Sequence, residues 1–118
     1  MQKKYRLKRR SDFRKIFRAG NSVANRQFVL VTRRNEELEE VRVGISVSKK
    51  VGNAVVRNRI KRTIKEIVRN WIPYIKSQLD IVIVVRNPVA TMDYHQIKSS
   101  LNHVFQRGKL FHTRPPKE

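Results

Sequence analysis

The chain has 118 residues and a formal net charge of +19, because 28 lysines and arginines face only 9 acidic residues. This length suits one domain, residues 1–118, whose core needs no disulfide or structural metal. So basic a balance is typical of proteins that bind nucleic acid or anionic membranes, and it is rare among enzymes that act on neutral metabolites. The chain has no cysteine, which excludes thiolate chemistry and allows a reducing compartment.

Two features argue against a membrane protein. The N-terminus is basic but lacks the apolar run of a secretory signal, and the longest apolar run, residues 81–85, is too short to span a bilayer. We therefore expect a soluble, cytoplasmic protein with no membrane partner.

Residues 1–10 form a basic segment in which Tyr5 and Leu7 are apolar, and we expect a flexible or loosely docked arm. A short helix should follow, with Ser11 as its N-cap and Gly20 as its end. Asp12 falls in the first turn, where a negative charge is favourable.

The apolar residues Phe13, Ile16 and Phe17 share one face of that short helix. Two interpretations of the phenylalanines remain open at this point. The rings are either ordinary core or a platform on which unpaired bases stack, because every base offers a face to an aromatic ring.

Three segments favour strands. Residues 22–34 favour a strand because of the run FVLVT at 28–32, and residues 81–85 form a continuous apolar run typical of a central strand covered on both faces. Residues 41–48 alternate, with valines and Ile45 on one face and small or polar residues around Gly44 on the other. That second face leaves room for a ligand backbone to come close. The acidic stretch at 35–40 is expected to be a surface loop.

The segment from residue 54 to residue 71 has the spacing of an amphipathic helix. Apolar or small residues recur every three or four positions along one side: Val56, Ile60, Thr63, Ile64, Ile67 and Trp71. The other sides are almost entirely positive, and only Glu66 interrupts them. Like charges repel at helical spacing, so a surface of one sign indicates an anionic partner, and phosphate supplies such charge as a long array.

A last helix is expected after a turn around Pro88, with Thr91 as a possible cap and Gly108 as its end. Residues 109–118 should form a flexible tail. The elements then follow the order α-β-β-α-β-α, which predicts an α+β fold: a two-layer α/β sandwich with three helices on a small twisted mixed sheet.

No constellation of catalytic residues is evident. The acids Asp12, Glu66, Asp80 and Asp93 are scattered, and each has a local role as a cap, helix-surface or turn residue. The three histidines lie late in the chain without the spacing of metal ligands. We therefore expect no catalytic residue and no metal site in the protein itself.

Residues 49–62, KKVGNAVVRNRIKR, closely resemble the signature of the protein subunit of bacterial ribonuclease P. The segments SVANRQFVL at 22–30 and RVGISVSKK at 42–50 resemble two strands of that family, and its first helix corresponds to the helix with Phe13 and Phe17. The resemblance covers almost the whole chain. It also implies the family's left-handed crossover between parallel strands, where general rules predict a right-handed one.

The resemblance implies a function. Family members bind a catalytic RNA, and the complex removes the 5′ leader of precursor tRNA by magnesium-dependent hydrolysis, with Mg²⁺ held mainly by the RNA. The expected partners are thus the ribonuclease P RNA and the precursor tRNA, with no obligate protein partner. The residues expected to bind the catalytic RNA are Lys49, Lys50, Arg57, Asn58, Arg59, Lys61, Arg62 and Lys65.

The same resemblance implies a cleft between the first helix and the sheet that holds the single-stranded leader. We expect Phe13, Phe17 and Val31 to line it, and we add Arg86, which follows the last strand. The alternative is a non-catalytic RNA-binding module, such as a ribosomal protein of similar size and charge. A membrane-surface protein is a third class, but its basic helix would expose bulky apolar residues to lipid.

Overall fold

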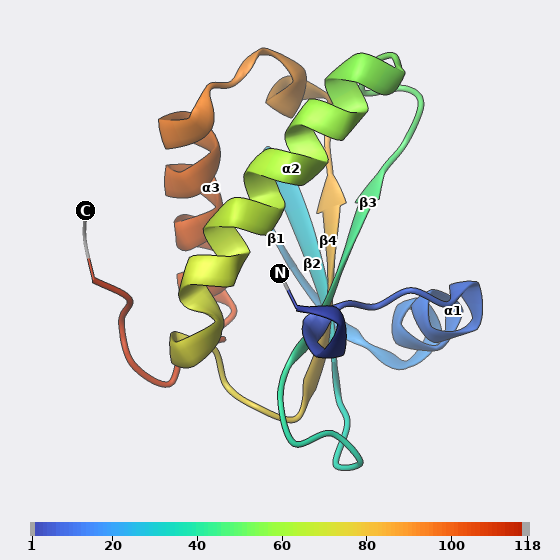
Figure 1. Cartoon of the computed structure of the whole chain (residues 1–118), viewed down its shortest axis with the longest axis vertical. Coiled ribbons are helices and arrows are strands. Elements are labelled where there is room, and N and C mark those ends of the chain that lie inside the picture. The colour runs from blue at the N-terminus through green and yellow to red at the C-terminus, as the bar shows by residue number, and fades with distance from the viewer. Residues whose placement is uncertain (1, 117–118) are drawn as a thin grey trace.

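A computed structural model describes residues 2–116 and shows one mixed four-stranded sheet with helices on both faces (Figure 1). The helices are α1 (Arg10–Ala19), α2 (Ala54–Trp71) and α3 (Tyr94–Arg107). The strands are β1 (Asn21–Ala24), β2 (Phe28–Arg34), β3 (Arg42–Val47) and β4 (Leu79–Val85). Short 3₁₀ turns occupy η1 (Lys3–Tyr5), η2 (Ile72–Tyr74) and η3 (Asn87–Thr91).

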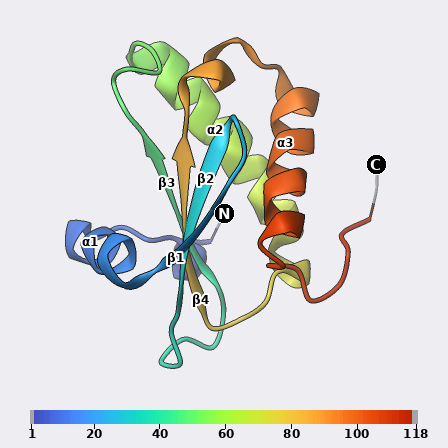
Figure 2. The same ribbon diagram turned by 180° about the vertical axis from the view of Figure 1, so that it is seen from behind.

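The sheet has the strand order β1-β2-β4-β3, in which β2 is antiparallel to both of its neighbours and β3 is parallel to β4. Helices α2 and α3 lie on one face, and α1 lies on the other (Figure 2). The α+β class, the mixed sheet and the three helices are confirmed. The apolar segment at 81–85 is the central strand β4, as its continuous apolarity predicts.

The connection from β3 through α2 to β4 is left-handed. Figure 1 shows α2 in front of the two parallel strands, with β4 to the left of β3 while both point upward. A right-handed crossover would place the second strand to the right in this view. The expectation that came from the family resemblance, and not from general rules, is therefore the correct one.

The main core fills the space between the sheet and helices α2 and α3. Buried side chains on α2 include Ile60, Ile64, Ile67 and Trp71, which match the predicted stripe, while Val56 and Thr63 are only partly buried. A smaller cluster lies under α1 on the opposite face. Its buried members are Leu7, Ile16, Val31 and Val82.

The segment at 22–34, predicted as one strand, forms the two antiparallel strands β1 and β2. Asn25 causes the reversal, because its side-chain oxygen accepts hydrogen bonds from the backbone N–H groups of Gln27 and Phe28 at 3.0 and 2.8 Å. Asparagine commonly turns the chain in this way. The observed order of elements is therefore α-β-β-β-α-β-α.

Two predicted helix caps are wrong. Helix α1 begins at Arg10, one residue before the predicted cap Ser11, and its N-cap residue Arg9 makes no side-chain capping bond. Helix α3 is capped by Asp93 instead of Thr91: Asp93 accepts from the backbone N–H of Gln96, and Gln96 accepts from the backbone N–H of Asp93, both at 2.9 Å. A carboxylate with a glutamine three residues later forms this reciprocal box.

Both ends of the described chain contact the core. In the N-terminal segment, the backbone N–H of Leu7 donates to Val43 on β3 at 3.0 Å, and its side chain is buried. In the C-terminal segment, Leu110 is buried and Phe111 stacks on Phe105 with ring centroids 5.4 Å apart. Residues 117 and 118 of the expected flexible tail lie outside the described residues.

Asp80 at the start of β4 is the one charged side chain that is fully buried among residues 2–116. Its carboxylate accepts from Arg42 Nε at 2.8 Å and from Asn35 Nδ2 at 3.0 Å. The hydrogen bond that Arg42 donates to Asp80 raises the pKa of Arg42 above its usual range, against the opposing effect of burial. Sequence reasoning gave Asp80 only a turn role, because its partners are 38 and 45 residues away.

Replacing Asp80 with alanine should therefore destabilise the fold. The change leaves the guanidinium of Arg42 and the amide of Asn35 without their acceptor, and breaking a buried ion pair typically costs about 3 kcal/mol or more. Urea unfolding of Asp80→Ala would measure the loss. The control Glu66→Ala removes an exposed ion pair with Arg69 and should change stability little; equal losses in the two variants would contradict this role for Asp80.

Candidate nucleic-acid interface

Helix α2 positions the predicted basic residues. Its first turn is capped by Asn53, whose side-chain oxygen accepts from the backbone N–H of Val56 at 3.0 Å. The buried stripe that faces the sheet fixes the rotation of the helix, so its polar residues must point to the sides and outward. Lys49 and Lys50 precede the helix in the exposed turn that follows β3.

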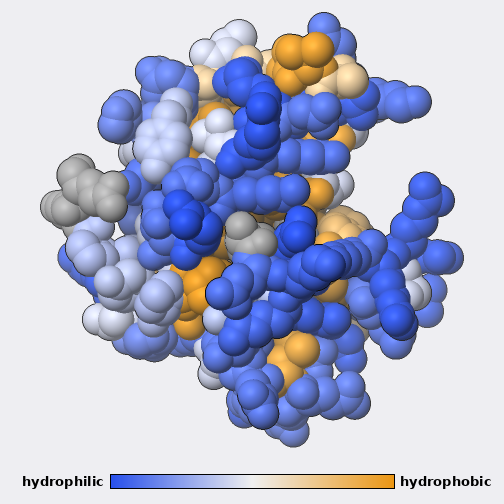
Figure 3. Space-filling model, viewed as in Figure 1, coloured by the Kyte–Doolittle hydropathy of each residue, from blue (hydrophilic) through white to orange (hydrophobic). Residues whose placement is uncertain are grey.

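The predicted RNA-binding residues, apart from Arg59, form what we call the α2 basic face. Its members are Lys49, Lys50, Arg57, Asn58, Lys61, Arg62 and Lys65. Asn58, Arg62 and the two lysines before the helix are exposed, whereas the other three are half-buried. No cation in this set forms an ion pair with another residue in the range 2–116. Figure 3 shows hydrophilic residues over most of this side, with separate hydrophobic patches.

Arg59 differs from the other cations of α2. Its guanidinium donates to the backbone carbonyl of Ala90 at 2.8 Å, and Met92 lies at the limit of hydrogen-bond distance at 3.5 Å. The side chain therefore ties α2 to η3, the turn that leads into α3. The family resemblance placed Arg59 with the RNA-binding residues. Helical periodicity could not correct this, because it shows which side of a helix a residue takes but not which carbonyl lies beside it.

Helix α1 positions the two phenylalanines differently. Phe17 is 49% exposed, whereas Phe13 is partly buried against the small cluster under α1. A Cβ atom at Gly44 would lie only 2.5 Å from Cζ of Phe13, so the ring rests directly on the backbone of β3. The room expected beside Gly44 for a ligand backbone is therefore filled by Phe13, and Val31 is buried in the same cluster.

Beyond α1, the same face of the sheet continues as a row of partly buried residues. Strand register aligns Ala24, Val29, Val84 and Ser46 across the four strands. These small or apolar side chains leave part of the sheet accessible, and the outline of the molecule is indented between α1 and the first turns of α2 (Figure 3).

Arg86 lies two residues after Val84, at the end of the same face. Its backbone N–H donates to Gln27 at 2.9 Å, and its guanidinium donates to the carbonyl of Asn25 at 3.3 Å. The side chain is exposed and has no acidic partner among the described residues. Of the four predicted cleft residues, the structure thus brings Phe13 and Val31 into one cluster, exposes Phe17, and holds Arg86 at the β1–β2 turn.

An ion pair that sequence reasoning missed joins α1 to the sheet. Arg42 lies 3.6 Å from the Asp12 carboxylate through Nη1, while its Nε binds Asp80. Asp12 was predicted to act only on its own helix terminus. The pair instead anchors the helix that carries both phenylalanines.

Within residues 2–116, no three histidine, aspartate or glutamate side chains converge as metal ligands. No described helix is both long enough and apolar enough to cross a bilayer.

Known proteins resemble this chain over nearly its full length. The family model for ribonuclease P matches residues 1–109. A ribonuclease P protein component from Listeria innocua is 48% identical over 115 residues, which are 98% of this chain and 97% of that protein. The solved RNase P protein of Staphylococcus aureus has a TM-score of 0.87 and 47% identity, covering 92% of this chain and 98% of that one. That of Thermotoga maritima has a TM-score of 0.79 and 34% identity, covering 86% and 96%.

The contacts of Arg59 predict that its replacement acts on stability. Arg59→Ala should lower the free energy of unfolding by about 1 to 2 kcal/mol, because it leaves the carbonyl of Ala90 without its charged donor. Arg62→Ala, which removes an exposed charge from the same helix, should leave stability nearly unchanged. Thermal or urea unfolding of the two variants would check this, and equal stability would show that the anchor at Arg59 contributes nothing.

Proposed function

This chain belongs to the ribonuclease P family, and we propose that it acts as the protein subunit that binds the catalytic RNA and the 5′ leader of precursor tRNA. The coarser role, a protein component of a ribonuclease, follows from the family. One observation of the structure supports the finer proposal most directly: the α2 basic face carries its cations without acidic partners among the described residues.

The α2 basic face suits the backbone of a folded RNA. Its cations project from a helix whose orientation is fixed by the core, so they are presented as a rigid array. Neutralising phosphates releases condensed counterions, which makes such binding strong at low salt and weak at high salt. We assign this face to the RNA subunit.

The side of the sheet that carries α1 suits single-stranded RNA. Phe17 offers an accessible ring on the helix that packs against the same face of the sheet as the partly buried row. Stacking on an aromatic ring binds unpaired bases with little sequence preference. We assign this surface to the leader, with Phe17 as the stacking residue, Phe13 as the ring that supports it, and Arg86 as a cation for the backbone.

We propose that the reacting groups belong to the RNA subunit, which would also hold the Mg²⁺ ions. The carboxylates that sequence analysis considered have other partners here: Asp80 binds Arg42, Glu66 pairs with Arg69, and Asp93 caps α3. The contribution of this chain would be to reduce repulsion between the two RNAs and to hold the leader, which favours substrate binding at low Mg²⁺.

Reconstitution tests the proposal. A bacterial ribonuclease P RNA should cleave a 5′-extended precursor tRNA at low Mg²⁺ much faster with this protein than without it, and the protein alone should not cleave. Tight RNA binding without stimulation would instead favour a non-catalytic RNA-binding module, such as a ribosomal protein.

Phe17→Ala should weaken binding of precursor tRNA to the assembled enzyme by about 1 to 3 kcal/mol, the usual contribution of one base stacked on an aromatic ring. Affinity for mature tRNA, which has no leader, should not change. Because Phe17 is half exposed, the variant should remain folded, as urea unfolding would show. Tyr94→Ala is a matched control, since it removes an exposed aromatic ring from α3 on the other face of the sheet; the same loss in both variants would contradict a leader role for Phe17.

A further inference from the structure

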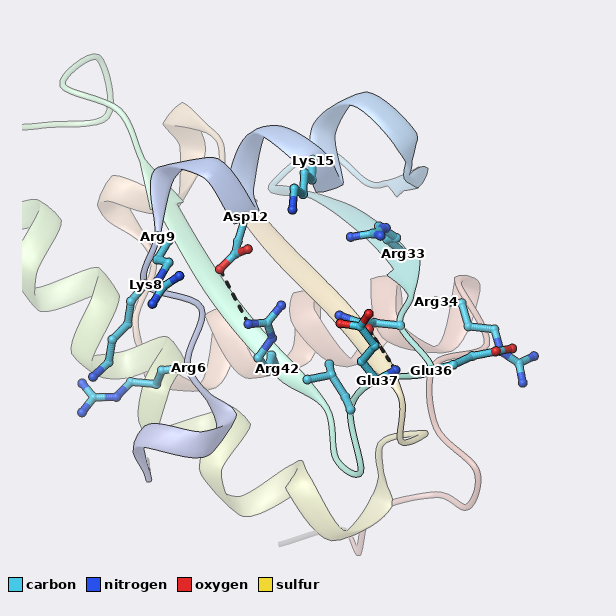
Figure 4. A pocket seen from close by; sticks show the side chains of 12 residues that line it. Arg6, Lys8, Arg9, Asp12, Lys15, Arg33, Arg34, Glu36, Glu37 and Arg42 are labelled. Carbon is cyan, nitrogen blue, oxygen red and sulfur yellow. Dashed lines mark hydrogen bonds and ion pairs between the residues drawn. The ribbon is translucent and has the colours of Figure 1, made fainter.

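A basic hollow of about 930 Å³ lies beside α1, bounded by residues 6–9, the end of β2 and the loop that follows it (Figure 4). Seven basic side chains and three acidic ones line it. The basic residues are Arg6, Lys8, Arg9, Lys15, Arg33, Arg34 and Arg42. No sequence pattern connects these residues, because they come from separate segments of the chain.

Local ion pairs account for only part of this charge. Arg42 pairs with buried Asp80 and with Asp12, and exposed Arg34 pairs with Glu36 at 3.5 Å. The other five basic side chains have no acidic partner among the described residues. Arg6 even has a buried Nε atom without a hydrogen-bond acceptor.

Two of these unpaired cations point into the basic hollow. Lys15 projects from α1 and Arg33 from β2 (Figure 4). Arg33 lies opposite Asp80 in the sheet register, but the Asp80 oxygens are bound by Arg42 and Asn35. The fold therefore gathers like charges around a space accessible to water, which is unfavourable unless an anion reduces their repulsion.

The composition of the lining indicates the chemical class of the anion. Leu38 is its only residue with a large apolar side chain, and it contains no aromatic residue, so a base would find no ring on which to stack. Lysine and arginine around a polar hollow suit phosphate groups instead. Acidic Glu37 also lines the hollow; its charge opposes an anionic ligand, so the site must bind phosphate through its larger number of basic side chains.

The basic hollow and Phe17 lie on opposite flanks of α1. Ile16 points into the cluster against the sheet; at 100° per residue, Phe17 falls on one side of it, and Asp12 and Lys15 fall on the other. A strand of RNA that reaches the basic hollow therefore makes contacts that are separate from the stacking surface.

We propose that the basic hollow is a second site for RNA phosphates, with Lys15 and Arg33 as its principal ligands. This inference rests on the proposed function, since it assumes an RNA partner. The phosphodiester backbone has two sources in the assembled enzyme: the leader beyond the part that contacts Phe17, or a strand of the RNA subunit.

The test uses the double variant Lys15→Gln/Arg33→Gln in the reconstituted enzyme. Losing two contacts to a single strand should reduce the salt dependence, the slope of log K against log salt, by roughly 1.4. If the leader is the source, affinity should fall for precursor tRNA with a long leader but not for mature tRNA or for the RNA subunit. If the RNA subunit is the source, affinity of the protein for that RNA should fall.

Two further variants separate a binding role from damage to the fold. Lys76→Gln/Arg114→Gln removes the same charge from exposed positions outside the basic hollow. It should change the slope of log K against log salt less than Lys15→Gln/Arg33→Gln does. Glu37→Gln removes an acid from the lining and should strengthen RNA binding, which a destabilised protein would not do; Glu39→Gln, in the same loop but outside the lining, is its control.

The inference is overturned if the double variant matches the Lys76→Gln/Arg114→Gln control for both RNAs, or if Glu37→Gln and Glu39→Gln behave alike. Failure of the proposed function would look different, because the wild-type protein would then not stimulate cleavage at all.

Discussion

The contact between Arg42 and Asp80 is the interaction on which both sides of this protein depend. Asp80 lies at zero exposure at the start of the central strand, and Arg42 binds it with Nε while reaching Asp12 of α1 with Nη1. A buried carboxylate without such partners would be strongly unfavourable. The same guanidinium therefore neutralises the buried Asp80 carboxylate and anchors α1 to its face of the sheet.

The position of α1 determines what its two flanks offer. Ile16 and Phe13 hold the helix against the sheet, and Phe13 comes so close to β3 that a Cβ atom at position 44 would overlap its ring. Phe17, one turn further on, is left half exposed. A small movement of α1 would change the stacking surface and the basic hollow together, so the ion pair at Arg42 contributes to positioning both.

Regular periodicity made much of the fold predictable. The stripe of α2, the alternation of β3 and the glycines after α1 and α3 are local patterns that the structure follows. Features that depend on distant residues were not predictable. Arg59 donates to a carbonyl 31 residues away, and Asp80 accepts from Arg42 on the neighbouring strand, 38 residues away. The family resemblance, and no general rule, supplied the left-handed crossover.

The same difference between local patterns and distant contacts decided which parts of the site could be predicted. Helical spacing identified which residues of α2 face outward, but it did not separate Arg59, which anchors η3, from Arg62, which is free of such contacts among the described residues. The reversal at Asn25 was missed because one side chain accepting two backbone hydrogen bonds breaks a run that otherwise favours a strand. The basic hollow combines segments that no periodicity connects.

Helix α2 remains stable despite its many like charges because burial of its apolar stripe contributes more free energy than the charge repulsion costs. Each repelling pair at helical spacing costs about 0.2 to 0.5 kcal/mol, whereas each large apolar side chain buried along the stripe contributes about 1.5 to 3 kcal/mol. Trp71 ends that stripe in edge contacts with Phe105 and Phe111, both at 5.3 Å between ring centroids. The core can therefore hold the cations of α2 in a fixed array without acidic neighbours, and this leaves their charge for an external anion.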